Sequence, residues 1–395
     1  MPADMQTQHF DLAIVGGGPV GAALAAGLQG SGLHGKGLKV VVLEARTKLE
    51  APDPRAIALS EGSHLILNRL GVWEALSPHA TPIDHIHVSQ RGGFGRAELN
   101  AAEMGVNALG YVAEYGDLYA ALAQGLSQAG GATILTGARV TQAAATAGYG
   151  MVRYEQAGEE KLLTANLVVL SEGGKALPPN LRKEKDYGQS AVVCTVHTTQ
   201  PHMQRAYERF TPEGPIALLP LHDAYALVWT TPSDQVESRL ALSDADFLAQ
   251  LQLAFGDRQG RFTAASPRAS FPLKLSLAKE SNSPRIVRIG NAAHVLHPVA
   301  GQGFNLGLRD AWKLAETLLD MPIEKIGTTS LDHYAQQRQA DIKGGSLMTD
   351  LLVAGFSNDH PALRHLRGVA LGALDILPPL KTLFARKMMF GSQSW

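Results

Sequence analysis

The chain has 395 residues, of which 45% are hydrophobic and 18% charged, a composition typical of a globular protein and not of a disordered or fibrous one. This length suits two domains, or one domain with a large insertion. The 35 Lys and Arg residues nearly cancel the 36 Asp and Glu residues, which leaves no basic field to attract nucleic acid.

The segment from Leu12 to Leu33 contains no Asp, Glu, Lys or Arg. An uncharged stretch of this length is also found in membrane spans and signal peptides, so both have to be considered. The flanking "MPADMQTQHFD" has two acids and no basic residue, and glycines and Pro19 interrupt the run. We therefore expect a cytoplasmic protein without a membrane span. The single cysteine, Cys194, lies among β-branched residues and is interpreted as a packed strand cysteine in a reducing compartment.

The N-terminal segment predicts a nucleotide-binding turn. An apolar strand at Leu12–Val15 leads into Gly16, Gly18 and Gly21, and an alanine-rich helix follows. In such a turn the first glycine permits the tight bend, the second lets a pyrophosphate approach, and the third lets helix pack on strand. The helix N-terminus favours the anion. A glycine-rich turn without a ligand is the alternative.

A second buried strand, "LKVVVLEAR", ends at Glu44, 23 residues after Gly21. An acid near this spacing holds the 2′-hydroxyl of a ribose. The pattern therefore predicts a dinucleotide with a free 2′-hydroxyl, either FAD or NAD.

Two later strands also end in polar or glycine turns. "NLVVL" runs into Glu172 and Gly173, and "RIVRI" runs into Gly290 and Asn291. Doubly wound sheets bind ligands at such strand ends. Both segments are expected to return to the same ligand.

The glycine fingerprint, "DPRAIALS", "GNAAHVLHPVAGQGFN" and the tail "FSNDHPALRHLRGVALGALDILPPLK" together resemble the FAD-dependent aromatic hydroxylases of ubiquinone biosynthesis. The branch that looks closest is that of 2-polyprenyl-6-methoxyphenol hydroxylase. The resemblance implies an α/β fold: a Rossmann-like FAD-binding domain, a β-sheet substrate domain like that of para-hydroxybenzoate hydroxylase, and C-terminal helices.

On this resemblance the FAD-binding domain is discontinuous and takes residues 1–74, 106–186 and 281–345. The substrate domain takes 75–105 and 187–280, and a C-terminal helical region takes 346–395. Alternating β-branched and aromatic runs between 187 and 280 agree with a sheet. A long helix is predicted after Gly303, with Leu308, Ala311, Ala315 and Leu318 on one face.

The reaction that the resemblance implies begins with reduction of FAD by NAD(P)H, which acts as a transient reductant. O2 then adds to give a flavin C4a-hydroperoxide, whose distal oxygen passes to a polyprenylated (methoxy)phenol. The alternatives are an FAD-binding oxidoreductase without oxygenation, or a flavin-stabilised subunit of a biosynthetic complex. No side chain in the sequence stands out as the base for the phenol.

The segment before the long helix is expected to face the flavin. Gly301, Gln302 and Gly303 open the helix, and bare amides there would stabilise the anionic N1 edge of reduced flavin. Asn305, at the end of the same run, is counted with the cofactor-binding residues. By resemblance, the carbonyl of Pro298 lies near C4a, with simple loop rigidity as the alternative.

The histidines of this segment carry weaker predictions. His297 is a candidate for hydrogen bonding to flavin or for lining the substrate pocket. His294 and His297 are three residues apart, but no third ligand is apparent, so no metal site is predicted. Asp310, Lys313 and Glu316 are interpreted as the exposed face of the following helix, without chemistry.

Arg55 is placed by the resemblance over the flavin or its phosphates, where a fixed cation offsets negative charge. A solvated loop arginine is the alternative. Two departures from the wider class stand out. Glu172 and Ala176 replace an aspartate and a hydroxyl residue, which puts the NAD(P)H step in doubt, and Asn291 replaces an aspartate, which marks the subfamily.

The tail from Leu347 to Phe390 mixes apolar helical runs with Arg and Lys. Ordinary packing helices are one interpretation. The other is a basic, apolar surface that rests on a membrane or on a ubiquinone-biosynthesis complex. A polyprenylated substrate would then place the protein at the periphery of the inner membrane.

Overall fold

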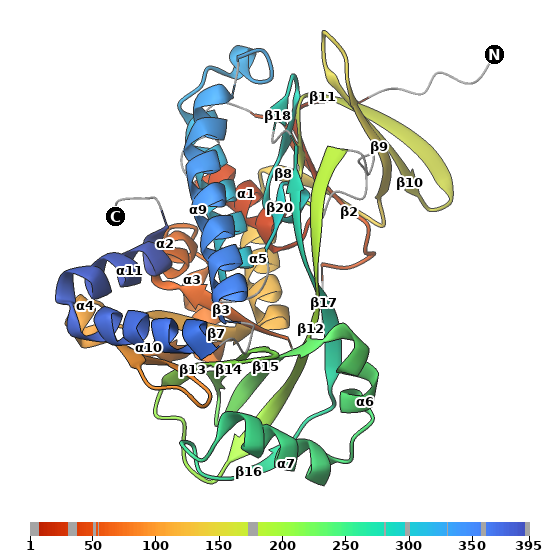
Figure 1. The fold of residues 1–395 in the computed structure, drawn as a ribbon. Coiled ribbons are helices and arrows are strands. Elements are labelled where there is room, and N and C mark those ends of the chain that lie inside the picture. The colour runs from red at the N-terminus through yellow and green to blue at the C-terminus, as the bar shows by residue number, and fades with distance from the viewer. Residues whose placement is uncertain are drawn as a thin grey trace.

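The computed structural model describes residues 8–30, 38–49, 53, 55–172, 181–279, 282–296, 301–329, 331–356 and 361–391. Three β-sheets form the scaffold, and helices cover them (Figure 1). The predicted strand, glycine turn and helix at the N-terminus are all present. His297, Pro298, Gly173 and Ala176 lie outside the described residues.

The first sheet has the order β18-β19-β11-β1-β2-β8, and β10 and β9 extend it from β11. Its central strands β19, β11, β1, β2 and β8 are parallel. The strands are β1 (Gln8–Val15), β2 (Val40–Glu44), β8 (Ala132–Thr136), β9 (Arg139–Ala145), β10 (Gly150–Gln156), β11 (Glu159–Leu170), β18 (Asn282–Ser283) and β19 (Ile286–Arg288).

The second sheet has the order β20-β17-β12-β15-β14-β13-β5-β6, and β16 pairs with β12. Its strands are β5 (His85–Gln90), β6 (Arg96–Asn100), β12 (Arg182–Thr198), β13 (Arg205–Thr211), β14 (Gly214–Leu221), β15 (Ala224–Pro232), β16 (Phe262–Ala265), β17 (Ala269–Ala278) and β20 (His294–Val295). A third sheet, in the order β3-β7-β4, contains β3 (Ala56–Ser60), β4 (Thr81–Ile83) and β7 (Gly110–Glu114).

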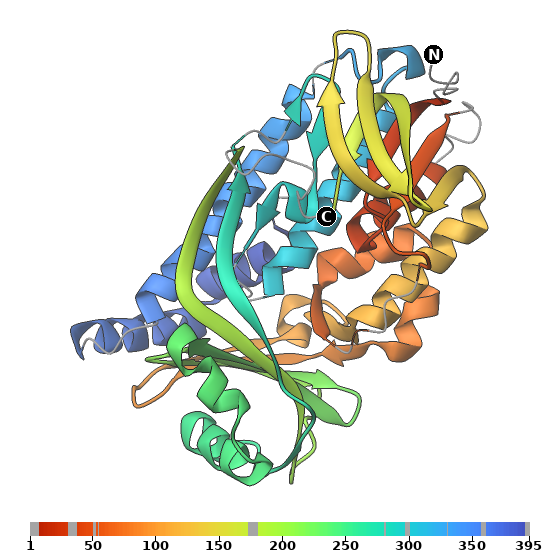
Figure 2. The ribbon, with the colours of Figure 1, turned by 90° about the vertical axis from the view of Figure 1, so that its right-hand side faces the viewer.

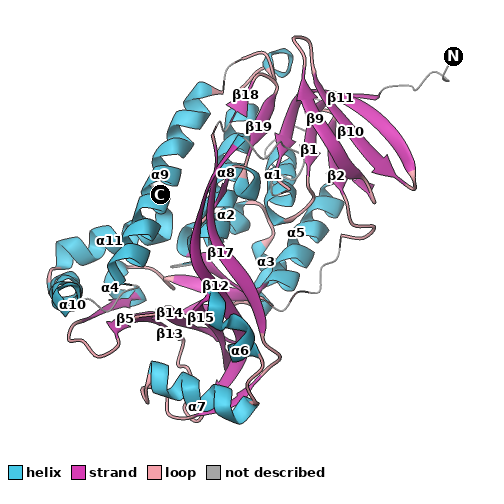
Figure 3. Ribbon diagram, turned by 45° about the vertical axis from the view of Figure 1, so that its right-hand side comes forward, coloured by secondary structure: helices cyan, strands magenta, loops and turns pink. Residues whose placement is uncertain are grey.

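The helices lie mainly around the first sheet and along one side of the molecule (Figure 3). They are α1 (Pro19–Gly30), α2 (Glu61–Arg69), α3 (Trp73–Leu76), α4 (Ala101–Met104), α5 (Tyr115–Ala129), α6 (Val236–Leu240), α7 (Asp244–Phe255), α8 (Gln302–Leu319), α9 (Asp332–Phe356), α10 (Pro361–Ile376) and α11 (Pro378–Phe390).

Strand β1 is buried on both faces, as its uninterrupted apolar sequence predicts. Leu12 and Ile14 pack in the core with α1, α5 and α8, whereas Ala13 and Val15 pack in a second cluster with β9 to β11. The parallel strands consequently end at one edge of the sheet, where the turns after β1, β2, β11 and β19 meet.

Two long strands join the upper and lower parts of the molecule. β12 and β17 pair from Arg182 with Ala278 to Val193 with Ala269, and the pair runs from beside the first sheet down into the second (Figure 2). This pairing places the second sheet below the edge at which the parallel strands of the first sheet end.

The second sheet has an outer and an inner face. On the outer face Tyr207 packs with Phe247 of α7. The inner face consists of alternate residues of β5, β6, β13, β14 and β15, beginning with Ile86, Ala97, Ala206, Pro215 and Ala224, because directly paired residues share a face. Through Ala206 this face packs with residues of the third sheet.

Cys194 lies half-buried on β12 and packs against the outer-face core, as the sequence predicts. Burial raises the pKa of its thiol to about 12. No single helix in the described part of the chain is long and apolar enough to cross a membrane.

Candidate functional site

The turn after β1 shows the three glycine roles that the sequence predicts. Gly16 has φ +103°, and a Cβ there would lie 2.8 Å from the Cβ of Glu172. A Cβ on Gly21 would lie 2.0 Å from the carbonyl oxygen of Gly16. Within the described part of the chain, nothing lies within 4 Å of a Cβ built on Gly18, so its backbone is open to a phosphate group.

Glu44, at the end of β2, lies against this turn. Its Oε2 accepts a hydrogen bond from the Gly17 amide at 2.9 Å, and its Oε1 accepts from the Arg46 amide at 2.9 Å. These bonds hold the buried carboxylate in place. Each oxygen keeps a second lone pair for a ribose hydroxyl.

Ser171, which sequence reasoning missed, joins the end of β11 to the same turn. Its hydroxyl lies 2.9 Å from the carbonyl oxygens of Val15 and Gly16. The side chain thereby ties the second predicted segment to the first, and it places Glu172 against Gly16. The sequence feature that could have revealed this role is a serine placed directly after a buried strand.

The third segment turns at Gly290, which has φ +54° and follows β19. The Gly290 amide donates to Oδ2 of Asp310 at 2.9 Å. Asn291 is exposed, and its backbone carbonyl accepts a hydrogen bond from the guanidinium of Arg182 of β12 at 3.0 Å. Arg182, which carried no prediction, therefore anchors this turn to the second sheet.

Helix α8 begins at the edge where these turns meet. Gly301 precedes it with φ +62°, and a Cβ there would lie 3.1 Å from Ala58 of β3. At Gly303 no described residue lies within 4 Å of the Cβ position. Gln302 donates to the Met388 carbonyl of α11 at 3.4 Å. The helix start is thus bare on the side of Gly303, which fits close approach by a cofactor.

Asn305 uses its whole amide on protein groups. Its Oδ1 accepts from the Ser60 amide at 2.9 Å and from the Ser63 hydroxyl at 2.6 Å. Its Nδ2 donates to the carbonyls of Ala58 at 2.9 Å and Gly301 at 2.6 Å. With two acceptor and two donor positions filled, the side chain holds the start of α8 against β3. Direct contact with a cofactor stays a prediction.

The interpretation of Asp310 as an exposed residue is wrong. Its side chain is buried, its Oδ2 lies 2.5 Å from Nε2 of His294, and its Oδ1 accepts from Arg338 of α9 at 2.6 Å. The predicted apolar stripe of α8 is buried and packs toward α1, but α9 covers another side of the helix, which removes Asp310 from water. Lys313 and Glu316 do form a partly exposed pair at 3.2 Å.

Asp310 belongs to a larger buried charge cluster. Arg338 also donates to Asp341 at 2.9 Å, and Arg309 donates to the same carboxylate at 2.8 Å. Burial alone would raise the pKa of Asp310, but the charges of His294 and Arg338 more than offset it and lower the pKa to about 2. The contribution to stability is therefore present at neutral pH and lost as the pH falls from 3.8 through about 2.

Arg55 lies where the third sheet approaches the second. Its guanidinium donates to both carboxylate oxygens of Asp53 at 2.8 Å. It also lies over the rings of Tyr115 at 5.4 Å and Phe271 of β17 at 4.8 Å. Hydrogen bonding to Arg55 lowers the pKa of Asp53. A half-exposed cation is thus fixed between the start of α5 and β17.

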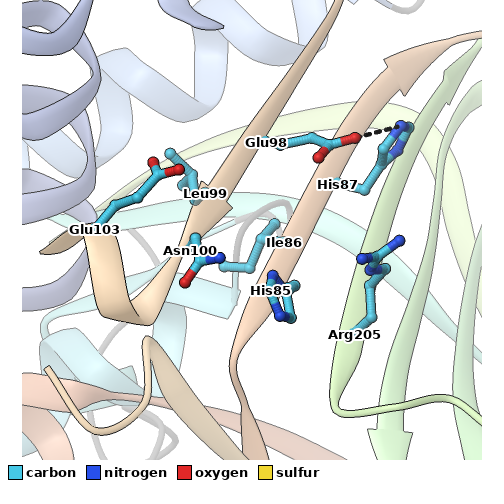
Figure 4. Close-up of a pocket in the computed structure, with 8 residues that line it drawn as sticks. All are labelled: His85, Ile86, His87, Glu98, Leu99, Asn100, Glu103 and Arg205. Atoms are coloured by element: carbon cyan, nitrogen blue, oxygen red, sulfur yellow. Dashed lines mark ion pairs between the residues drawn. The ribbon is translucent and has the colours of Figure 1, made fainter.

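A separate small pocket lies between β5, β6, α4 and the start of β13 (Figure 4). It contains none of the predicted cofactor-binding residues. His87 and Glu98 approach to 3.9 Å, but burial and nearby Arg258 lower the pKa of His87 to about 4, so its ring is neutral at pH 7. Within the described ranges, no three His, Cys, Asp or Glu side chains are grouped to hold a metal ion.

Comparison with known proteins gives matches along nearly the whole chain. A family model described as "FAD binding domain" matches residues 9–344. The ubiquinone hydroxylase UbiL of Rhodospirillum rubrum is 33% identical over 402 residues, which cover 96% of this chain and 89% of that protein. The 3-demethoxyubiquinol 3-hydroxylase of Escherichia coli is 31% identical over 394 residues, which cover 95% and 97%.

Solved structures show the same fold at lower sequence identity. The p-nitrophenol 4-monooxygenase PnpA of Pseudomonas putida superposes with a TM-score of 0.79 at 18% identity, over 98% of this chain and 100% of that one. The anhydrotetracycline hydroxylase OxyS of Streptomyces rimosus superposes with a TM-score of 0.73 at 20% identity, over 98% and 77%.

We predict that Gly303→Val weakens retention of the bound dinucleotide at least ~10-fold, because two methyl groups enter the open space beside the start of α8. Compared without cofactor, the variant and the parent protein should unfold at the same temperature, since the added Cβ meets no atom of a described residue within 4 Å. Cofactor content per mole of purified protein measures the loss. Gly372→Val in α10, where the space is equally open, is the control. Full occupancy in Gly303→Val would remove this residue from the site.

A second prediction concerns the buried charges. Asp310→Ala should lower the free energy of unfolding by about 3–5 kcal/mol, because it leaves His294 and Arg338 buried without their shared partner. Denaturant titration of the purified variant measures this change. Glu316→Ala, on the same helix but at the surface, should stay within about 1 kcal/mol of the parent protein. If the two substitutions lowered the free energy of unfolding equally, the buried charge cluster would not be important for stability.

Proposed function

The chain belongs to the FAD-binding domain family and is an FAD-dependent aromatic monooxygenase, and we propose that it hydroxylates a polyprenylated (methoxy)phenol in ubiquinone biosynthesis. Its fold is the mixed α/β fold of flavin hydroxylases that the sequence predicts. Relatives named for ubiquinone and demethoxyubiquinol hydroxylation match it over almost their whole length, which supports this substrate class.

The residues at the strand ends fit FAD. The open backbone at Gly18 and the N-terminus of α1 suit the pyrophosphate, Glu44 suits a ribose hydroxyl, and the bare start of α8 at Gly303 suits the flavin ring. When bound, FAD supplies the redox chemistry, with NAD(P)H as the reductant typical of this class and O2 as the source of oxygen. The protein binds the cofactor, shields the reaction from water and orients the substrate ring.

The observation that carries the proposal is the position of the inner face of the second sheet. Most of its side chains are apolar, and it packs at its margin on the third sheet, whose strand β3 abuts the start of α8 through Ala58. An apolar face of this kind suits an aromatic ring with a prenyl substituent. We infer that the substrate ring lies between this face and the flavin.

The C-terminal helices supply the second part of the proposal. Large apolar side chains are exposed on α9, α10 and the α10–α11 corner: Leu347, Leu351, Leu366, Val369, Ile376, Leu377, Leu380 and Leu383. Residues 361–395 also carry five Lys or Arg and one acid, although the whole chain has a net charge of −1. Helices α10 and α11, bent by 95° to each other, project from one side of the molecule (Figure 1).

We propose that this surface rests on an anionic lipid bilayer. Leu366, Val369 and Ile376 form one stripe along α10, and Leu380 and Leu383 continue it on α11. The exposed cations Arg386 and Lys387 follow on α11. Apolar side chains beside basic ones are the pattern of an interfacial surface. A polyprenylated substrate would reach the protein from this side, with the protein in the cytoplasm at the periphery of the inner membrane.

Isotope labelling tests the substrate class. With NADPH, 18O2 and a prenylated methoxyphenol, the protein should form a hydroxylated product that carries one 18O atom, measured by mass spectrometry. Product without the label would show that the inserted oxygen does not come from O2. No product from this phenol, with NADPH oxidation unchanged by its addition, would overturn the proposed substrate class.

Vesicle sedimentation tests the lipid surface. The protein should bind vesicles that contain phosphatidylglycerol, bind phosphatidylcholine vesicles more weakly, and be released by salt. The double variant Leu380→Glu, Leu383→Glu should bind at least ~10-fold more weakly, because two apolar contacts are lost. Leu253→Glu on α7, also highly exposed, is the control. Concentration-dependent self-association without vesicle binding would identify the surface as a contact between copies of the chain.

A further inference from the structure

The inner face of the second sheet carries one ionisable side chain, Glu208 of β13. The other residues that β5, β6, β13, β14 and β15 place on this face are apolar, apart from Gln90 and Thr230. The register places Glu208 between Val88 of β5 and Ala217 of β14. These two neighbours are small, so the carboxylate stands among short apolar side chains.

The packing of its neighbours along β13 supports this orientation. Ala206, two residues before Glu208, packs with Ile83, Val112 and Ala56 of the third sheet. Tyr207, one residue before it, packs on the opposite face in the core with α7. Because side chains alternate along a strand, Glu208 points to the same side as Ala206. That side is the one that the third sheet covers.

The inner face also lies close to the residues that are proposed to face the flavin. Ala56 follows Arg55 directly, and the guanidinium of Arg55 lies over Phe271, which pairs with Ala191 beside the inner face. β3 also contacts the start of α8 through Ala58 and Gly301. A ring that lies between the inner face and the start of α8 would therefore lie near Glu208.

Among the described residues, none forms a hydrogen bond or ion pair with the half-buried side chain of Glu208. Other carboxylates in the interior have such partners, as Glu44 and Asp310 show. Loss of hydration on burial raises the pKa of Glu208 to about 7. A carboxylate in this condition is costly for the fold, which is typical of a group kept for chemistry.

The elements packed on this side carry few other ionisable groups. β4 has none, β7 has Tyr111 and Glu114, and the last half of α9 has Asp350, which Lys185 and Tyr187 bind at 2.7 Å. The described side chains of α10 add Arg364, His365, Arg367 and Asp375. On the inner face formed by β5, β6, β13, β14 and β15, Glu208 is the one ionisable side chain.

We propose that Glu208 is the catalytic base that accepts the proton of the substrate phenol. This step rests on the proposed function. The phenolic O–H bond breaks, its electron pair stays on the phenol oxygen, and the proton moves to a carboxylate oxygen of Glu208. The resulting phenolate is richer in electrons at the ring carbon that takes up oxygen. No further reactant is needed for this transfer.

The match between acid and base is favourable. A phenol of the tyrosine type has a pKa of about 10, and a base with a pKa near the working pH is the most effective general base. A solvated glutamate, with a pKa of about 4.3, would be a much weaker base. The apolar face of the sheet thus adjusts the carboxylate to its task.

The test compares Glu208→Gln with Glu98→Gln, a glutamate on β6 of the same sheet that does not lie on the inner face. The kcat/KM for the prenylated methoxyphenol is measured from pH 5 to 9, per mole of bound FAD. In the parent protein it should fall as the pH drops through about 7, because Glu208 takes up a proton. Glu208→Gln should lose this limb and about 100-fold of the rate at pH 8. Glu98→Gln should keep both the pH-dependent limb and the rate at pH 8.

Further measurements separate a base from a structural role. FAD content and reduction by NADPH without substrate should be unchanged in Glu208→Gln, and Glu208→Asp should restore part of the pH-dependent limb. If the parent protein hydroxylates the phenol and Glu208→Gln keeps its rate and pH profile, Glu208 is not the base. A parent profile that is flat near pH 7 would overturn the assignment even if the variant fails to fold. If the parent makes no product, the proposed function itself fails.

Discussion

The buried carboxylate of Asp310 is the interaction on which the arrangement of the site depends. It binds the amide of Gly290, the ring of His294 and the guanidinium of Arg338, so one side chain connects a turn, a short strand and helix α9. Breaking one such contact would leave a buried charge without its partner, which strongly favours keeping all of them together. The direction in which α8 leaves the strand ends is set in this way, and Asn305 then holds the start of the helix against β3.

The two large sheets contribute in different ways to the chemistry. The first sheet offers mainly backbone: open glycines, helix starts and one carboxylate, Glu44, held by two amides. Such groups suit a large, charged cofactor because they bind it without side-chain rearrangement. The second sheet offers an apolar face with the single carboxylate Glu208. Arg55 lies beside the second sheet, paired with Asp53 and stacked on Phe271.

The sequence predicted best what depends on local pattern. The glycines after β1, the buried strands and Glu44 follow from spacing and from runs of apolar residues, and the structure shows each of them in place. Asp310 was missed because the periodicity of α8 shows which side is apolar but not that a second helix covers the other side. Glu208 was missed because a lone acid in a strand usually faces water, and only strand register reveals its surroundings. Three of the four hydrogen bonds of Asn305 likewise reach residues that lie about 245 positions away in the sequence.

The long pairing of β12 with β17 has a consequence for how this chain can vary. The two strands run from beside the first sheet into the second, and they are paired across a register shift between Asp186 and Gln189. Because side chains alternate, adding or removing one residue on the second-sheet side of this shift would exchange the inner and outer residues beyond it. Insertion or deletion of two residues here would therefore keep each side chain on its face of the sheet, whereas a change of one residue would invert the faces. In surface loops, by contrast, an odd change of length does not exchange the faces of a strand.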